Sequence, residues 1–367
     1  TGDLITTTSG TSNFVAGVNA GNSIASGGNY NVVVGDEAGT ALTLGDESVA
    51  VGFEALMTAT TGAENVGIGY RALKLTTGNS NVAVGKNALA TNSSASNNTA
   101  VGTSALAANT TGADNVAVGS NALASTTTAS DNTAVGVNAL DTNTTGDNNA
   151  AVGKNALDAN TTGNFNTALG RGALAANVTA HRSTAVGYNA LETANVSGDS
   201  NAYNTAVGFG AGAAVTDGLQ NTLIGGLTGD SITSGDNNTA VGQGALGLET
   251  TGGRSIAIGV GALASQNLTG NELPYNVAIG VNAGTSITTS VQNTLIGGLA
   301  GDAITTGVQN TIVGFNNDVD TGGADNRFGF GSNLSLTSGS TIKIGNGNTF
   351  ITNTWGSNAT WSHSSDE

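Results

Sequence analysis

The chain has 367 residues, including 57 Gly, one Pro and no Cys, and its formal net charge is -16. An acidic chain of this kind repels nucleic acid and anionic lipid. The sequence contains no run of 18 apolar residues, so it predicts no membrane-spanning segment. Without Cys, a disulfide framework and a Cys-based zinc site are excluded.

Residues 1–30 begin the chain with one weak copy of a repeat. The segment "NFVAG" ends at Gly17 and has the apolar and glycine positions that recur along the chain. We therefore expect residues 1–30 to form an N-terminal cap and a first, irregular coil.

Residues 31–315 consist of one repeat, in which a short aliphatic run ends in a glycine. We call the 17 glycines that end these runs the repeat glycines. Of the 16 intervals between them, 13 are 17 residues long, one is 16 and two are 21. The repeat glycines are Gly35, Gly52, Gly69, Gly85, Gly102, Gly119, Gly136, Gly153, Gly170, Gly187, Gly208, Gly225, Gly242, Gly259, Gly280, Gly297 and Gly314. With 38% apolar and only 9% charged residues, this period predicts an all-β chain, a parallel β-solenoid (β-roll or β-helix) of 17-residue coils.

The residues just before the repeat glycine suggest which side chains are inside. The residue one before it is Val, Ile or Leu, and the residue three before it is mostly Val or Thr, as at Val135 and Thr133. These two positions share one face of a strand, and we expect them to fill the core. The opposite face carries Ala and Gly, as at Ala134 and Gly136. Because a face in water should be polar, we expect this small-residue face to pack against a second copy in a homo-oligomer.

The rest of each coil follows a pattern that recurs from coil to coil. An Ala-Leu pair follows three and four residues after the repeat glycine, as at Ala139 and Leu140, and a Thr-Thr-Gly turn commonly comes next. We expect two short strands joined by two turns, with each coil adding about 4.8 Å.

Polar residues also recur in columns. Asn or Ser stands four residues before the repeat glycine, as at Asn132. We expect the stacked Asn amides to bond from coil to coil. Asn109, Asn143 and Asn160 begin Asn-x-Thr triplets; we favour turn chemistry over glycosylation for them.

Two coils, 188–208 and 260–280, are four residues longer than the others. Each places a tyrosine, Tyr203 or Tyr275, just before the Asn of the next strand. Insertions in a solenoid form loops on one face, which is frequently the binding face. The two tyrosines are therefore candidate ligand-binding residues, and the alternative is a tolerated bulge that packs its tyrosine onto the solenoid.

Residues 316–367 lose the regular pattern and gain aromatic residues, including Trp355 and Trp361. We expect a segment that caps the open end of the solenoid. The alternative is a platform on which sugar rings stack, with Trp355 and Trp361 as binding residues.

Catalytic groups are missing from the pattern. The carboxylates are scattered through turns, and the only histidines are His181 and His363, far apart in sequence. No paired carboxylates and no Ser-His-Asp set can be argued. We expect no enzymatic activity, no cofactor and no metal site.

The columns "N-[TSV]-[VA]-A-[VI]-G-x-x-A" resemble the heads of trimeric autotransporter adhesins, which are parallel β-rolls of three chains. Repeats such as "NTAVGVNALDTNTTGDN" are also similar to those of phage tail fibres and related bacterial adhesive fibres. The C-terminal "TWSHSSDE" resembles the junction between such fibres and an endosialidase-type intramolecular chaperone. The resemblance implies a homotrimer and places a chaperone cleavage junction between Ser365 and Asp366.

These features together predict a non-enzymatic fibre that is extracellular, either a virion tail fibre or a bacterial surface adhesin. It would provide a stiff shaft and bind a cell-surface glycan or protein receptor. Two alternatives stay open: a structural filament without a receptor, and an ice-binding solenoid. Against the second, the adjacent threonines stand in turns and not as Thr-x-Thr on a strand.

Overall fold

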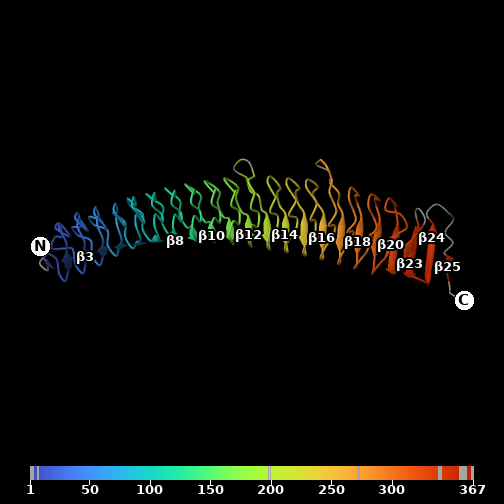
Figure 1. Ribbon diagram of the computed structural model, residues 1–367, viewed down its shortest axis with the longest axis horizontal. Helices are drawn as coiled ribbons and strands as arrows, with labels where there is room; N and C mark the ends of the chain where they lie inside the picture. The colour runs from blue at the N-terminus through green and yellow to red at the C-terminus, as the bar shows by residue number, and fades with distance from the viewer. Residues whose placement is uncertain are drawn as a thin grey trace. The chain divides into compact units, whose positions relative to one another are not determined.

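The computed structural model describes the chain except for residues 1–3, 6–7, 197, 199, 271–272, 338–340, 355–361 and 365–367. The chain divides into two units, Thr1–Arg182 and Ser183–Glu367, and each is described by itself. Each unit is a stack of similar coils, with one short strand in every regular coil (Figure 1).

The strands of the first unit are β1 (Leu4–Ile5), β2 (Phe14–Ala16), β3 (Val32–Val34), β4 (Val49–Val51), β5 (Val66–Ile68), β6 (Val82–Val84), β7 (Thr99–Val101), β8 (Val116–Val118), β9 (Thr133–Val135), β10 (Ala150–Val152) and β11 (Thr167–Leu169). Those of the second unit are β12 (Thr184–Val186), β13 (Thr205–Val207), β14 (Thr222–Ile224), β15 (Thr239–Val241), β16 (Ile256–Ile258), β17 (Val277–Ile279), β18 (Thr294–Ile296), β19 (Thr311–Val313), β20 (Asp318–Val319), β21 (Phe328–Ser332), β22 (Ser335–Leu336), β23 (Thr341–Asn346), β24 (Phe350–Thr354) and β25 (Ser362–Ser364).

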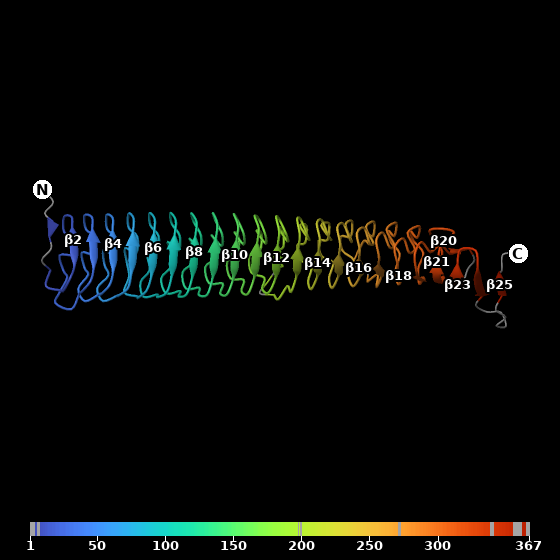
Figure 2. The same cartoon turned by 90° about the horizontal axis from the view of Figure 1, so that it is seen from below.

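Within each unit, the strands of successive coils pair in parallel and in register (Figure 2). Ala117 pairs with Ala134 across the usual 17 residues, and Ile256 pairs with Val277 across a long coil of 21. The four extra residues therefore leave the ladder unchanged. The predicted fold class, an all-β parallel solenoid with coils of about 17 residues, is confirmed.

The two strand faces are the reverse of what the sequence suggested. Ala134, expected to face another chain, is fully buried inside its own coil. Val135 and Thr133, expected in the core, point outward. Val135 is half-buried and Thr133 is exposed. The prediction was wrong because the core space beside the strand is already occupied by the leucine four residues after the repeat glycine, as at Leu140.

Exchanges between two core columns show that they share this space. Where the leucine position holds Gly229, the inner strand position holds Leu223, and a Cβ added to Gly229 would lie 2.9 Å from Leu223 Cδ2. In the next coil the two residues are Ala240 and Leu246, both buried. In these two coils one large and one small side chain therefore fill the space at nearly constant volume, as close packing requires.

Each regular coil has one strand and not the two predicted. The Ala-Leu segment is a turn, because Leu140 has φ 53° and Asn138 has φ 56°. Ala139 N donates to the Gly136 carbonyl, and Leu140 N donates to Ala156 of the next coil at 3.0 Å. The left-handed backbone turns the leucine inward while the peptide groups still bond from coil to coil.

The predicted asparagine ladder is present and buried. Asn132 Nδ2 donates to Asn115 Oδ1 at 3.2 Å and to the Ser130 carbonyl at 3.0 Å. Its own Oδ1 accepts from the backbone N of Asn149 at 2.9 Å. The Asn132 amide thus satisfies groups in its own coil and in the two neighbouring coils, as is usual for a buried polar side chain.

A second internal ladder, which the sequence analysis missed, stands seven residues after the repeat glycine. Asn109 Nδ2 donates to Asn92 Oδ1 at 3.1 Å, and Asn160 Nδ2 donates to Asn143 Oδ1 at 2.8 Å. Thr126 interrupts this ladder, and the buried atoms Asn109 Oδ1 and Thr126 Oγ1 have no hydrogen-bond partner among the described residues.

We expect the substitution Thr126→Asn to stabilise the first unit by about 1 kcal/mol, because the new amide can donate to Asn109 Oδ1 and accept from Asn143. Urea denaturation followed by circular dichroism measures the change. Thr142→Asn is the control, because Thr142 bonds only backbone carbonyls near the surface. If Thr126→Asn is no more stable than the native chain, Asn109 Oδ1 and Thr126 Oγ1 already have other hydrogen-bond partners, such as water.

The ends of the parallel stacks carry antiparallel strands. In the first unit, β1 pairs antiparallel with β2. In the second unit, β21 and β23 continue the parallel ladder beyond β19, and β24 and β25 then add in antiparallel order. β20 and β22 form a separate two-stranded sheet.

Candidate interaction surfaces

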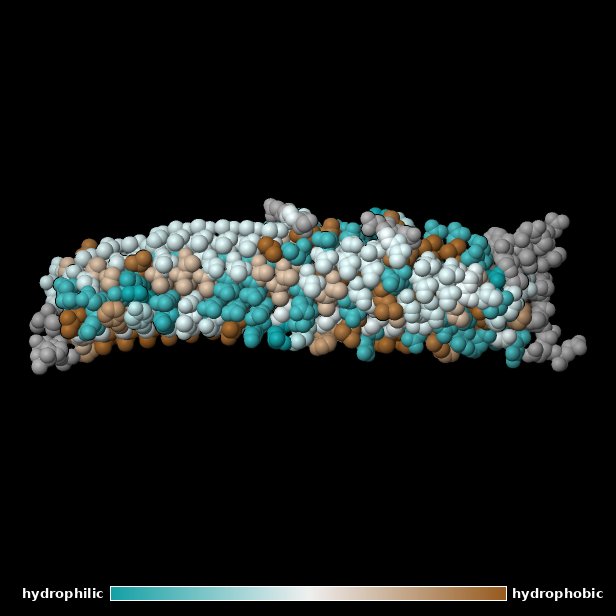
Figure 3. Space-filling model, turned by 45° about the horizontal axis from the view of Figure 1, so that its top comes forward, coloured by the Kyte–Doolittle hydropathy of each residue, from teal (hydrophilic) through white to brown (hydrophobic). Residues whose placement is uncertain are grey.

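The outer strand face is formed by residues one and three before each repeat glycine. The residues one before the glycine are Val, Ile or Leu and form an apolar, accessible column along this face. Val118 is 36% exposed, Ile224 is 38% exposed and Leu169 is 48% exposed. In Figure 3, brown apolar residues line the lower edge of the view at the N-terminal side, within the first unit. A repeated row of aliphatic side chains in water is the mark of a surface that another molecule covers.

Aromatic residues directly after the repeat glycine extend this face. Phe53 stacks on Tyr70 with ring centroids 5.7 Å apart, and Tyr188 stacks on Phe209 at 5.3 Å. The residue one coil later thus lies directly over its predecessor, so an aromatic residue in two successive coils makes a stacked pair.

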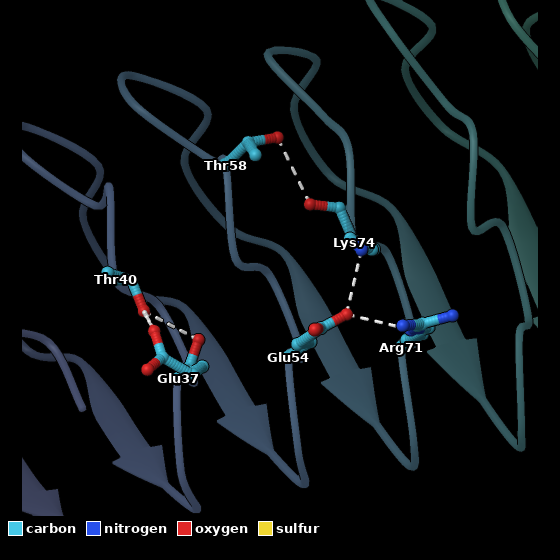
Figure 4. Close-up of polar contacts among 6 residues, drawn as sticks. All are labelled: Glu37, Thr40, Glu54, Thr58, Arg71 and Lys74. Carbon is cyan, nitrogen blue, oxygen red and sulfur yellow. Dashed lines mark hydrogen bonds and ion pairs between the residues drawn. The ribbon is translucent and has the colours of Figure 1, made fainter. Parts of the chain in front are cut away.

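Charged side chains gather beside the first aromatic pair (Figure 4). Glu54 Oε2 lies 2.7 Å from both Arg71 Nε and Lys74 Nζ. The two cations lower the pKa of the Glu54 carboxyl, and Glu54 raises the pKa of Arg71. Since both cations form ion pairs with a carboxylate of their own chain, we interpret the cluster as surface ion pairs that link neighbouring coils.

The predicted ligand-binding residues Tyr203 and Tyr275 belong to one row on the second unit. This tyrosine row is the column five residues before the repeat glycine, and it comprises Tyr203, Gln220, Asn237, Arg254 and Tyr275. All five residues are exposed. All five have φ between 50° and 63°, which turns each side chain away from the coil just before the buried ladder residue. Tyr203 and Tyr275 are 49% and 48% exposed, so about half of each side chain is accessible.

The two tyrosines are thus brought to the ends of one row, four coils apart. Arg254 Nη1 donates to the Tyr275 hydroxyl at 2.7 Å, and its guanidinium lies 5.7 Å from the ring centroid. Sequence reasoning missed Gln220, Asn237 and Arg254. Their shared distance from the repeat glycine was the signal that could have found them.

A second column lies beside the tyrosine row, three residues before each repeat glycine. Thr205, Thr222 and Thr239 stand there, followed by Ile256 and Val277. No side-chain hydrogen bond of the three threonines is found within the described part of the chain. All three threonines are half-buried on the outer strand face, whereas turn threonines such as Thr216 and Thr233 bond the next coil.

Other predicted residues lie elsewhere. Trp355, Trp361, Ser365 and Asp366 fall outside the described residues, so the structure does not place them. His181 is buried, and its Nδ1 accepts from the backbone N of Asn164 at 2.8 Å, which fits a structural residue.

The Asn-x-Thr triplets are closed to modification in the folded chain. Asn109, Asn143 and Asn160 are fully buried, and each donates its amide to a glycine carbonyl three residues later. Turn and ladder chemistry accounts for these residues.

An acidic pair in the second unit has unusual electrostatics. The half-buried Asp318 accepts from the backbone N of Ala303 at 3.1 Å and of Val319 at 2.8 Å. Burial first, and then the neighbouring Asp302, raise the pKa of Asp318 from 3.8 to about 6, against the effect of the two N–H donors.

This shift makes the stability of the second unit depend on pH. Because the folded pKa is the higher one, the contribution of protonated Asp318 is fully present below pH 3.8 and is lost as the pH rises through about 6. We expect Asp318→Asn to be more stable than the native chain at pH 7.5, by about 1 kcal/mol after solvent screening, and equal to it at pH 4. Urea denaturation at the two pH values tests this, with Asp325→Asn as the control. A gain that is the same at both values would refute the titration.

Among the described residues, no group of three His, Cys, Asp or Glu side chains could hold a metal ion. No helix in this part of the chain is long and apolar enough to cross a membrane. No protein-family model matches the chain, and searches of the curated proteins and of the solved structures found no significant match.

Proposed function

We propose that this chain is the shaft and receptor-binding region of a non-enzymatic fibre, outside the cell or on a virion, that acts as a homotrimer. The observation that carries the proposal is the apolar outer strand face, repeated in register along each unit. A receptor on a cell surface, glycan or protein, is its partner.

The outer strand face supports self-association more directly than the small-residue face first considered. Ala134 and its equivalents are inside the coil and unavailable to a partner. Val118 and Ile224 are accessible, and neighbouring coils repeat them at about 4.8 Å. Further copies of the chain carry the same spacing, so the aliphatic rows of three parallel chains can face a common axis and match over many coils in a closed ring.

Sedimentation equilibrium tests the trimer. The expected mass is about 107 kDa, three times the 35.6 kDa of one chain. The double variant Ile224→Asp and Ile258→Asp buries two carboxylates in the proposed interface and is expected to sediment as a smaller species. Thr306→Asp, in an exposed turn, is the matched control. A monomeric native chain, or a double variant of unchanged mass, would contradict the proposal.

The second part of the proposal is attachment. The tyrosine row combines two phenol rings, two amides and a guanidinium, and its two ends lie in the coils whose length departs from the repeat. Specific recognition needs such variety, because a uniform Val and Thr surface offers the same contacts at every coil.

One observation favours the ice-binding alternative. The sequence analysis placed the adjacent threonines in turns, but Thr205, Thr222 and Thr239 also stand in register on the outer strand face. A flat row of threonines at a regular spacing can match a lattice. A thermal-hysteresis assay decides: freezing-point depression without cell adsorption would favour this function over attachment.

A further inference from the structure

We propose that the tyrosine row binds one neutral, linear oligosaccharide that lies along the second unit, with a sugar ring against each of Tyr203 and Tyr275. This inference rests on the proposed attachment function and names the chemical class of its ligand.

The first argument is geometric. The strands β13 to β17 pair in register without a break, so residues of one column follow each other at the strand spacing of about 4.8 Å. Tyr203 and Tyr275 are four coils apart, which places them about 19 Å from each other. An extended chain of pyranose rings has a similar advance for each ring. A short linear oligosaccharide can therefore reach both tyrosines while it follows the coils.

The second argument is the kind of group between the tyrosines. Gln220 and Asn237 present exposed amides, which donate and accept. A row of amides with an aromatic ring at each end suits a ligand that carries many hydroxyls on apolar rings.

The third argument is charge. In the sequence from residue 182 to residue 280 the cationic residues are Arg182 and Arg254, against seven Asp and Glu residues. Arg254 is already bonded to the Tyr275 hydroxyl, and Asp236 lies beside Asn237 with its carboxylate bonded to Leu219 N at 2.7 Å. This field repels sulfated and other anionic glycans, nucleic acids and anionic lipids. A neutral glycan has no such cost.

The fourth argument is the role of Arg254. Its bond to the Tyr275 hydroxyl and its position over the ring hold the ring in one orientation. A ring that is already oriented loses less conformational freedom when a sugar binds. Arg254 is thus a positioning residue for Tyr275. Tyr275→Phe removes this bond and keeps the ring, so it should weaken binding less than Tyr275→Asn.

Titration calorimetry of the native oligomer with maltohexaose, cellohexaose and chitohexaose tests the proposal, with a sulfated hexasaccharide as the anionic comparison. We expect at least one neutral hexasaccharide to bind at about millimolar concentration, as is usual for an open surface. Tyr203→Asn and Tyr275→Asn should each weaken binding by about tenfold or more. Asn already occupies this column at Asn237, so the backbone tolerates it. Gln309→Asn, in the same column beyond the row, is the matched control and should bind as the native protein does.

Three results would overturn the proposal: no binding of any neutral hexasaccharide, preference for the sulfated one, or binding that survives both tyrosine variants. Adsorption to a panel of bacterial and epithelial cells separates this inference from the attachment function. Equal adsorption of the native protein and the tyrosine variants would refute the row and leave attachment standing. Sugar binding that the tyrosine variants lose, without adsorption to any cell, would support the row and contradict attachment.

Discussion

Gly225→Ala is expected to destabilise the second unit by more than about 3 kcal/mol. Gly225 has φ 139°, a conformation that is nearly restricted to glycine. An added Cβ would also lie 2.6 Å from the Thr228 hydroxyl oxygen and 2.7 Å from the Gly242 carbonyl oxygen. The Thr228 hydroxyl donates to the Gly242 carbonyl of the next coil, so neither oxygen can easily move away. The cost of the backbone conformation and the cost of the steric clash therefore add.

The adjacent residue provides the control. A Cβ at Gly226 would meet nothing within 4 Å, so Gly226→Ala should change stability by less than about 0.5 kcal/mol. Urea denaturation and amide hydrogen exchange measure both variants, and exchange should rise first in the coils next to Gly225. Similar stabilities for the two variants would mean that the coils can separate locally without loss.

Asn132→Asp is expected to cost about 3 to 5 kcal/mol at pH 7. The amide nitrogen of Asn132 donates to two oxygens in a fully buried site. A carboxylate there would face the same two oxygens with no proton to donate. At low pH the acid regains one donor, so the loss should be smaller.

The chain itself supplies the milder substitution for comparison. Ser48 occupies the same column, and its hydroxyl oxygen accepts from Asn65 N at 3.2 Å. Asn132→Ser should therefore cost only about 1 kcal/mol. Thermal and urea denaturation of the two variants at pH 4 and pH 7 provide the test. An aspartate variant as stable as the serine variant at pH 7 would show that water or a proton reaches the ladder.

The repeat predicted the period, the parallel register and the asparagine ladder, because each of these follows from spacing alone. The inner face could not be assigned from alternation, because a strand of three residues offers only two faces and both looked apolar. One coil has Leu223 with Gly229, and the next has Ala240 with Leu246 at the same two positions. This exchange of a large for a small residue was already visible in the sequence. Comparison of coils with each other, and not of positions within one coil, would have shown which residues share the core.

The candidate site was predicted in part. Tyr203 and Tyr275 stood out because they lie in the two coils that interrupt the repeat, and about half of each side chain is exposed. Gln220, Asn237 and Arg254 did not stand out, since single polar residues in turns are common. Their importance depends on stacking, which brings residues 17 or 21 positions apart to neighbouring places in one row.

The in-register pairing of Ile256 with Val277 across a long coil has an evolutionary consequence. Since the ladder fixes only where a strand begins and ends, the residues between can lengthen without disturbing the neighbours. Loop length and side chains at this corner can then diverge freely while the scaffold stays intact. A chain built this way can change what it recognises by small insertions in one coil, without having to evolve a new fold.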